Sequence, residues 1–173
     1  MTSLVALSIS IGVLGGVATW LALGPLGGFL VIWGMFVGWA TFFALGGDNA
    51  ALQKGIICNV HGVIWAWLAA VLILIIPLAE PLSLPVWAAI VVGLTVMGMC
   101  LAAHITILSS IPASVLGFAS TFAFYLQTPD VMVFDILTGG HFGNPTLVIA
   151  LSLVAGAIFG WLSGQLGNVL TKK

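Results

Sequence analysis

Six long apolar segments, separated by short turn sequences, dominate the chain. They cover residues 4–23, 28–46, 55–77, 84–105, 109–126 and 144–168. A helix needs about 20 mostly apolar residues to cross the hydrocarbon layer of a bilayer. The segments lack strand-like alternation, and continuous apolar runs that span a bilayer satisfy their backbone hydrogen bonds as helices. We therefore predict an all-α integral membrane protein with six transmembrane helices, which form a single membrane domain over residues 1–173.

The composition leads to the same class of protein. Hydrophobic residues make up 62% of the chain and charged residues 4%. Soluble domains carry about 25% charged residues, so this composition does not supply a water-facing surface. The formal net charge of −1, without a basic patch, argues against nucleic acid as a partner. No basic region precedes the first apolar segment, so we expect a retained span rather than a cleaved signal peptide. The expected partner is the lipid bilayer.

The three lysines predict an orientation. With six spans, both termini lie on one side of the membrane. Lys54 falls in the second connection, and Lys172 and Lys173 end the chain, so all three share that side. Because lysine and arginine concentrate in cytoplasmic connections, we predict that both termini are cytoplasmic.

Two segments in different halves of the chain resemble each other. Residues 38–44 read GWATFFA, and residues 117–123, 79 positions later, read GFASTFA. The same offset aligns the first predicted span with the fourth, and the third matches the sixth with a further shift of about ten residues. Two halves of three spans each would have opposite orientations in the membrane, a plan that recurs in transporters. The alternative is a chance match in a sequence of low variety.

Glycine is frequent, with 22 residues, and it recurs at four-residue spacing in several spans. Small residues on one helix face let helix backbones approach closely in a membrane. The sequence leaves open whether these faces join helices within one subunit or within a homo-oligomer. The predicted helix-packing residues are Gly12, Gly16, Gly34, Gly38, Gly156, Gly160 and Gly164.

Polar side chains inside the predicted spans are the candidate functional residues. Asn59 and His61 point nearly opposite ways from one helix, so at least one should face protein or water. Either they form hydrogen bonds with a neighbouring helix or they line a path for a polar solute, together with His104 at the end of the fourth span. The full set of pathway candidates is Asn59, His61, His104, Thr41, Thr121, Trp39 and Phe118.

The two aromatic candidates, Trp39 and Phe118, occupy matching positions of the two similar segments. They either narrow a path or pack in the core. The histidines lack a carboxylate at ligand spacing, so we expect no metal site. Cys58 and Cys100 fit small packing positions better than a disulfide. Because the chain has no GxSxG, HExxH or P-loop pattern, we expect neither a cofactor nor an enzyme activity.

Two connections carry turn and polar residues. Between the second and third spans, Gly46 and Gly47 are expected to end one helix, and Asp48 or Asn49 to cap the next. The longest connection, residues 127–145, is either a solvated outer loop or holds a short amphipathic segment over VMVFDIL that rests on the other helices.

The run at residues 38–44, the following GGDNAALQKG and the segment NVHGVIWAW together resemble a family of small, six-span bacterial inner-membrane proteins that carry a domain of unknown function. The resemblance implies a bacterial inner-membrane location. It implies no activity, and no catalytic or binding residue can be transferred from it.

Three functions remain after this reasoning. The leading hypothesis is a membrane channel or facilitative transporter for a small neutral or weakly charged solute, because charge-free walls disfavour ions. The first alternative is a substrate-binding membrane subunit of a multi-component importer. The second is a structural membrane protein without transport activity. The sequence does not identify the solute.

Overall fold

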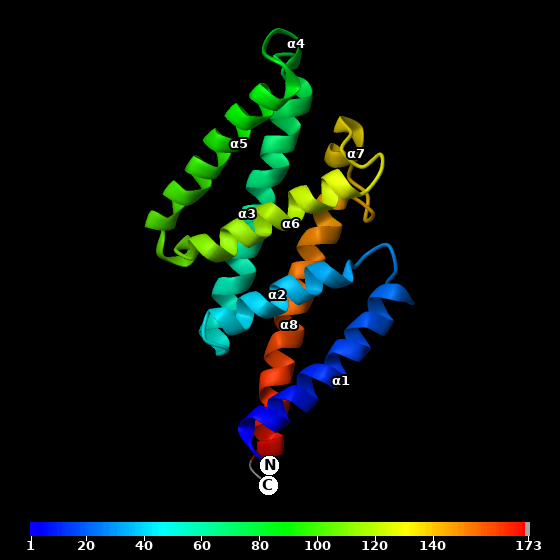
Figure 1. Cartoon of the computed structure of the whole chain (residues 1–173), viewed down its shortest axis with the longest axis vertical. Helices are drawn as coiled ribbons and strands as arrows, with labels where there is room; N and C mark the ends of the chain where they lie inside the picture. The colour runs from blue at the N-terminus through cyan, green and yellow to red at the C-terminus, as the bar shows by residue number, and fades with distance from the viewer. Residues whose placement is uncertain (172–173) are drawn as a thin grey trace. The chain divides into compact units, whose positions relative to one another are not determined.

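The computed structural model describes residues 1–171, and the regular structure of these residues is helical, without a strand (Figure 1). This confirms the prediction of an all-α chain. The elements are α1 (Ser3–Leu23), α2 (Ile32–Ala44), α3 (Asn49–Ile75), α4 (Ala79–Leu82), α5 (Leu84–Leu101), the 3-10 turns η1 (Ala102–His104) and η2 (Thr106–Leu108), α6 (Ile111–Gln127), α7 (Phe134–Thr138) and α8 (Pro145–Thr171).

Four of the six predicted spans are long and apolar enough to cross a membrane. Over residues 1–171 these are α1, α3, the segment Leu84–His104 and α8. Helices α2 and α6 are apolar but contain 13 and 17 residues, which at 1.5 Å per residue gives lengths of about 20 and 25 Å. Both are shorter than the ~30 Å hydrocarbon layer. Four of the six predicted spans are therefore candidate membrane spans by length and composition, and the count of six stays a prediction.

The polar turn between α2 and α3 forms as the sequence predicted. Gly46 and Gly47 have φ angles of 118° and 71°, and their N–H groups donate to carbonyls in the last turn of α2. This is the pattern of a Schellman cap, which glycine favours because it adopts positive φ without strain. The Asp48 carboxylate then accepts the N–H of Ala51 at 2.7 Å and caps α3. These residues end one helix and start the next.

The described helices gather into two compact units. The first, unit 1, contains residues 1–56 and the chain from Leu151 onward, and the second, unit 2, contains Ile57–Ala150. Unit 1 therefore holds α1, α2 and most of α8, whereas unit 2 holds most of α3 with α5, α6 and α7. The sequence comparison predicted two halves of three consecutive spans. In the structure each compact unit combines two helices from one half of the chain with a long helix from the other half: α8 in unit 1 and α3 in unit 2.

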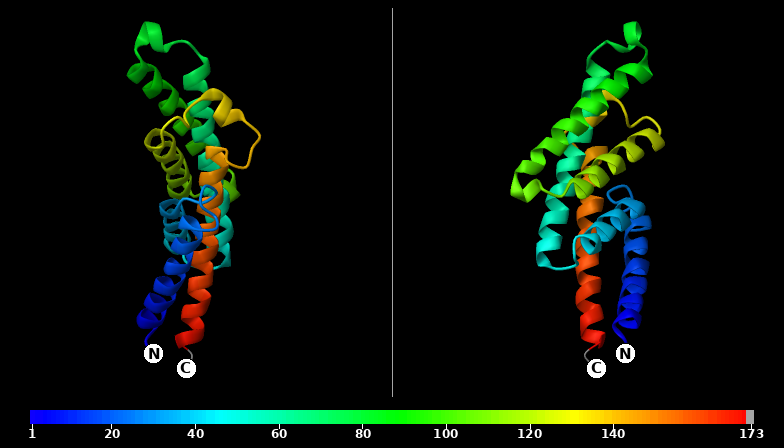
Figure 2. Two further views of the ribbon diagram at one scale, coloured as in Figure 1. Left: turned by 90° about the vertical axis from the view of Figure 1, so that its right-hand side faces the viewer. Right: turned by 60° about the vertical axis from the view of Figure 1, so that its left-hand side comes forward.

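In unit 1, α2 lies across α8 at a pair of glycines, and α1 runs beside α8 (Figures 1 and 2). A Cβ atom on Gly38 would overlap the carbonyl oxygen of Leu153, and one on Gly156 would overlap the carbonyl oxygen of Met35. The Ser10 hydroxyl of α1 donates to the carbonyl of Ser163 in α8 at 2.6 Å. The α2–α8 crossing thus depends on two reciprocal backbone contacts.

Unit 2 contains the same kind of crossing, between α3 and α6. A Cβ atom on Gly62 would overlap the carbonyl oxygen of Ser114, and one on Gly117 would overlap the carbonyl oxygen of Asn59. Next to this crossing lies an apolar core. Its buried members are Ala66, Ala69, Ile73, Trp87, Val91, Met99 and Phe118.

The glycine predictions hold for α2 and α8 but not for α1. Gly34 and Gly38 are buried, and a Cβ on Gly160 would lie 3.0 Å from Phe42 and Trp39, while one on Gly164 would lie 3.9 Å from Phe42. Gly12 and Gly16 do not pack against another helix within residues 1–171, and a contact with a second subunit, which the sequence left open, stays a prediction. Both are exposed, and a Cβ atom there would meet open space.

Helix α1 is turned so that a neighbouring face is buried. That face contains Ala6, Ser10, Gly15, Ala18 and Ala22. The Ser10–Ser163 hydrogen bond holds this orientation. A Cβ atom on Gly15 would lie 3.6 Å from the Phe36 ring, so this face has room for little more than a small residue. Small residues occur on more than one face of α1, and the Ser10–Ser163 hydrogen bond determines which of these faces packs against α8.

The long connection 127–145 contains the short packed segment, not only a solvated loop. In α7, Leu137 is buried and packs with Ala70 and Tyr125. The Trp67 indole N–H donates to the Leu137 carbonyl at 2.9 Å. Of the two alternatives for this connection, the segment that rests on the helices is confirmed for Phe134–Thr138.

Asn144 ties this connection to the start of α8. Its side-chain nitrogen donates to the carbonyls of Ile136, Leu137 and Gly139 at 3.1, 3.1 and 2.8 Å. Its side-chain oxygen accepts the N–H of Thr146 at 2.9 Å, which caps the helix. One buried amide therefore shapes the loop and starts the last helix.

Candidate functional site

Asn59, in the part of α3 that belongs to unit 2, is fully buried, with 0% of its surface exposed. Neither its side-chain oxygen nor its side-chain nitrogen has a hydrogen-bond partner among the described residues. Leaving a buried polar group without a partner costs about 1–3 kcal/mol, and native proteins keep few such groups. The indole nitrogen of Trp87 is likewise buried without a partner in residues 1–171. Asn59 differs from Trp87 in that both the donor and the acceptor of its side-chain amide lack a partner in the described residues; we call this amide open.

His61, two residues further along α3, is by contrast held at both ring nitrogens. The Trp65 indole N–H donates to Nε2 at 2.8 Å, and Nδ1 lies 3.2 Å from the Ser114 hydroxyl oxygen of α6. An indole nitrogen can only donate, so Nε2 must accept, and the neutral ring carries its proton on Nδ1. Of the two uses that the sequence allowed for His61, the structure contains the hydrogen bond to a neighbouring helix, α6.

We expect nitrogen NMR of ¹⁵N-histidine-labelled protein to show His61 as the Nδ1–H tautomer at neutral pH. Replacing Trp65 with phenylalanine keeps an aromatic ring but removes the donor to Nε2. The spectrum of that variant should shift toward a mixture of tautomers. A Cys100→Ser variant, which leaves both partners of His61 in place, should keep the wild-type pattern. An unchanged tautomer in Trp65→Phe would contradict the hydrogen bond.

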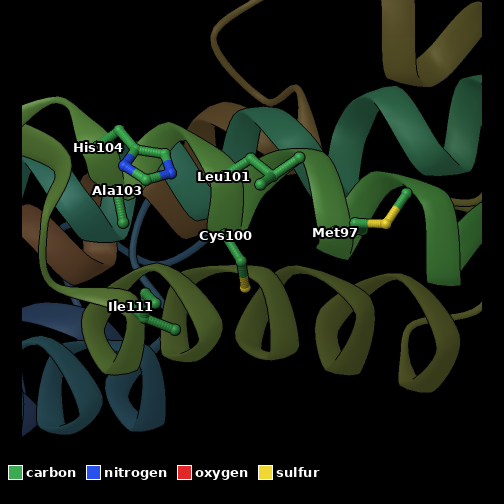
Figure 3. A pocket seen from close by; sticks show the side chains of 6 residues that line it. All are labelled: Met97, Cys100, Leu101, Ala103, His104 and Ile111. Atoms are coloured by element: carbon green, nitrogen blue, oxygen red, sulfur yellow. The ribbon is translucent and has the colours of Figure 1, made fainter.

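His104 is exposed in η1 and borders a cavity of about 390 Å³ in unit 2 (Figure 3). Met97, Cys100, Leu101, Ala103 and Ile111 form the rest of its lining. The Cys100 thiol points toward α6, while the Met97 sulfur and the His104 ring lie at opposite ends of the cavity lining (Figure 3). Within residues 1–171, no three His, Cys, Asp or Glu side chains gather in a way that could hold a metal ion.

The predicted pathway grouped His104 with Asn59 and His61. The cavity beside His104 is lined by neither Asn59 nor His61. His104 follows the end of α5, where the helix changes to two 3-10 turns. The sequence predicted a helix up to residue 105, whereas in the structure α5 ends at Leu101 and His104 lies in a 3-10 turn. The part of His104 in a pathway stays a prediction.

Thr41 and Thr121 are buried, at 1% and 0% exposure. Their hydroxyls donate to the carbonyls of Val37 and Gly117, one turn earlier in the same helices, at 2.8 Å each. Because each hydroxyl proton is engaged by its own backbone, each oxygen is available to another molecule only as an acceptor.

Trp39 and Phe118 each pack in the core of their own unit. The Trp39 indole donates to the Ser163 hydroxyl at 3.1 Å, and its ring stacks on Phe36 at 5.8 Å. Phe118 is 7% exposed and lies 5.1 Å from Phe122, ring centre to ring centre. Both aromatic rings thus pack in the core, which is one of the two uses that the sequence allowed. Their part in narrowing a pathway stays a prediction.

Sequence reasoning missed Ser114, the partner of His61. Trp65 had a signal, because His61 and Trp65 are four residues apart and such pairs meet on a helix surface. Ser114 had none, since its role depends on the crossing of α3 and α6 at Gly62 and Gly117.

A second cavity, in unit 1, brings three chain segments together. It has a volume of about 200 Å³, and its lining includes Ser3, Gly46, Gly47, Asn168 and Thr171. The start of α1, the end of α2 and the end of α8 therefore lie at one end of this unit. Lys172 and Lys173, which the orientation prediction used, lie outside the described residues.

Comparison with known proteins gives a family. A family model described as "Protein of unknown function (DUF1097)" matches residues 8–168. The chain belongs to the DUF1097 family. The match runs from α1 into the last turns of α8 and includes all seven pathway candidates. It confirms the resemblance to a family with a domain of unknown function. No curated protein and no solved structure matches this DUF1097 chain.

Proposed function

We propose that this DUF1097 protein forms a passage through the membrane for a small neutral solute, as a channel or facilitative transporter. The observation that carries the proposal is the open amide of Asn59, buried within a long apolar helix. Polar groups inside membrane helices are costly and commonly mark pathways. The acceptor oxygens of Thr41 and Thr121, buried in α2 and α6, support the same function.

The helices around Asn59 favour an uncharged solute. Residues 57–75 of α3, and all of α5 and α6, contain no Asp, Glu, Lys or Arg. An ion that leaves water requires compensating charge or well-placed dipoles. A neutral or weakly charged solute requires neither, so it fits this part of the chain better than an ion.

An inverted internal repeat suits this function, and the reciprocal glycine contacts support it. The Gly38–Leu153 and Gly156–Met35 contacts of unit 1 correspond to the Gly117–Asn59 and Gly62–Ser114 contacts of unit 2. In this correspondence α1 matches α5, α2 matches α6, and α8 matches α3. Gly62 and Gly156 are 94 positions apart, so the further shift exceeds the ten residues inferred from sequence.

Each proposed repeat is three consecutive segments, α1–α2–α3 and α5–α6–α8, and each would cross the membrane three times. The repeats would then have opposite orientations, a common plan of transporters. Rows of large apolar side chains exposed on α1 and α5 suit contact with lipid. They include Leu4, Val13, Trp20, Leu94, Met97 and Leu101.

For the location, we propose the bacterial inner membrane with both termini in the cytoplasm. The cavity shared by Ser3, Gly46 and Thr171 supports a common side for the start of α1, the α2–α3 turn and the end of α8. Lys54 lies in the second turn of α3, close to that turn. Lysine near a membrane boundary favours the cytoplasmic side.

Solute flux tests the proposal directly. Proteoliposomes in a stopped-flow instrument are challenged with urea, glycerol, short amides, acetate and ammonium, with water flux as a control. We expect at least one neutral solute to enter faster than into empty liposomes. Thr121→Val, which loses an acceptor without a change in size, should slow this flux about 2- to 10-fold, the effect of one hydrogen bond.

Ser8→Ala is the matched control. The Ser8 hydroxyl also donates to a carbonyl one turn earlier, at 2.8 Å, but on an exposed face of α1, so flux should not change. Equal rates in protein-containing and empty liposomes for every solute would overturn the passage and favour a binding subunit or a structural protein. The next experiment would then identify what co-purifies.

A further inference from the structure

The buried amide of Asn59 identifies a class of ligand. We propose that Asn59 is the binding point for a small uncharged molecule that carries both an N–H donor and a carbonyl acceptor, of the primary-amide or urea type. This inference rests on the proposed passage, because the ligand is taken to be the solute that passes.

Helix packing does not require an amide at this position. In unit 1, the equivalent position of the crossing is Leu153, whose carbonyl oxygen faces Gly38 as the Asn59 carbonyl oxygen faces Gly117. Leu153 is also fully buried. Leucine and asparagine have the same number of side-chain heavy atoms. A crossing of this geometry therefore accepts an apolar side chain, and Asn59 has a use other than packing.

The chemistry of the open groups selects the ligand. Both ends of the Asn59 amide lack a partner in the described part of the chain, so the conclusion does not depend on which end is oxygen and which is nitrogen. An amide places an acceptor and a donor side by side in one plane. A second planar group with its own N–H and C=O satisfies both through two parallel hydrogen bonds.

The surroundings exclude a charged form of the ligand. Residues 57–75, α5 and α6 provide no ionised side chain to balance a charge, and burying an unbalanced charge is far more costly than burying a neutral amide.

Thermal unfolding of the purified protein in detergent tests the site without transport. Acetamide is the probe, and N,N-dimethylacetamide, which has no N–H, is the matched control compound. We expect acetamide well above its Kd to raise the unfolding temperature of the wild-type protein by about 2–4 °C, whereas the dimethyl compound gives no rise. Asn59→Leu should unfold at a higher temperature than the wild type without a probe, and acetamide should not raise it further.

Two outcomes would overturn the inference. One is the same acetamide response in Asn59→Leu as in the wild type. The other is no response of the wild type to acetamide, which would mean that an ordered water satisfies the amide. If Asn59→Leu does not fold, Asn59→Ala, which cannot clash, takes its place, and its response to acetamide decides in the same way.

Acetamide flux in liposomes separates this inference from the proposed function. Flux that persists in Asn59→Leu, together with no acetamide binding, would remove the site and leave the passage. Binding that Asn59→Leu abolishes, without flux in the wild type, would keep the site and remove the passage. Loss of both binding and flux in Asn59→Leu is the expected result.

Discussion

Alanine in place of Gly156 should strongly destabilise the protein. The added Cβ would overlap the backbone carbonyl oxygen of Met35, and a backbone atom cannot rotate away as a side chain can. Helices α2 and α8 must then separate along their crossing. Overpacking of this kind costs about 1–3 kcal/mol or more, which exceeds the gain of up to ~1 kcal/mol that alanine gives in a helix. Thermal unfolding and folded yield in mild detergent measure the loss.

Two further variants control this result. Gly16→Ala makes the same chemical change on a helix where the Cβ meets open space among the described residues, so its stability should equal or slightly exceed that of the wild type. Gly62→Ala should behave like Gly156→Ala, because unit 2 has the same contact with the Ser114 carbonyl. A wild-type unfolding temperature for Gly156→Ala would show that α2 and α8 do not approach this closely.

The second large effect is expected for Asn144→Ala. This change removes the cap of α8, worth about 0.5–2 kcal/mol, and leaves the carbonyls of Ile136 and Gly139 without this donor, while the Leu137 carbonyl keeps the Trp67 indole. Partly buried carbonyls without partners add further cost, so we expect a total loss of about 2–4 kcal/mol. Hydrogen exchange at residues 134–139 should increase more than exchange elsewhere, because the amide holds this segment.

Asn144→Ser and Asn168→Ala set the scale for that measurement. Serine keeps a capping oxygen but reaches fewer carbonyls, so its stability should fall between those of the wild type and Asn144→Ala. Asn168 is exposed near the end of α8, and alanine there should change stability by less than about 0.5 kcal/mol. Equal stabilities of Asn144→Ala and Asn168→Ala would disprove the role of Asn144.

Local features of the fold were predictable from sequence. Gly46, Gly47 and Asp48 act within one turn of their own position, so the residue types alone indicated a helix end and a helix start. The pairing of helices was not predictable in this way. In a membrane the faces that touch lipid and the faces that touch helices are equally apolar. Gly12 and Gly16 therefore looked as suitable for packing as Gly15, which the structure buries.

In the candidate site, too, contacts within one helix were predictable from the sequence and contacts between helices were not. His61 and Trp65 are close in sequence, and their spacing indicated their contact. Whether Asn59 has a partner depends on what the crossing helix offers at Gly117, and both alternatives were open from sequence. In the structure α6 crosses α3 closely at Gly62 and Gly117, and within the described residues the Asn59 amide has no hydrogen-bond partner.

The exchange of third helices between the units has a consequence for synthesis. Helices α1 and α2 leave the ribosome before α8, yet unit 1 also requires α8 from Leu151 onward. At about 5–20 residues per second, residues 57–150 occupy the ribosome for roughly 5–20 s. During this time the Gly38 face of α2 lies in the translocon or in lipid without its packing partner, α8. Helices α1 and α2 are thus completed by α8, and a nascent chain that stops before α8 would leave these earlier helices, not the later ones of unit 2, without a partner.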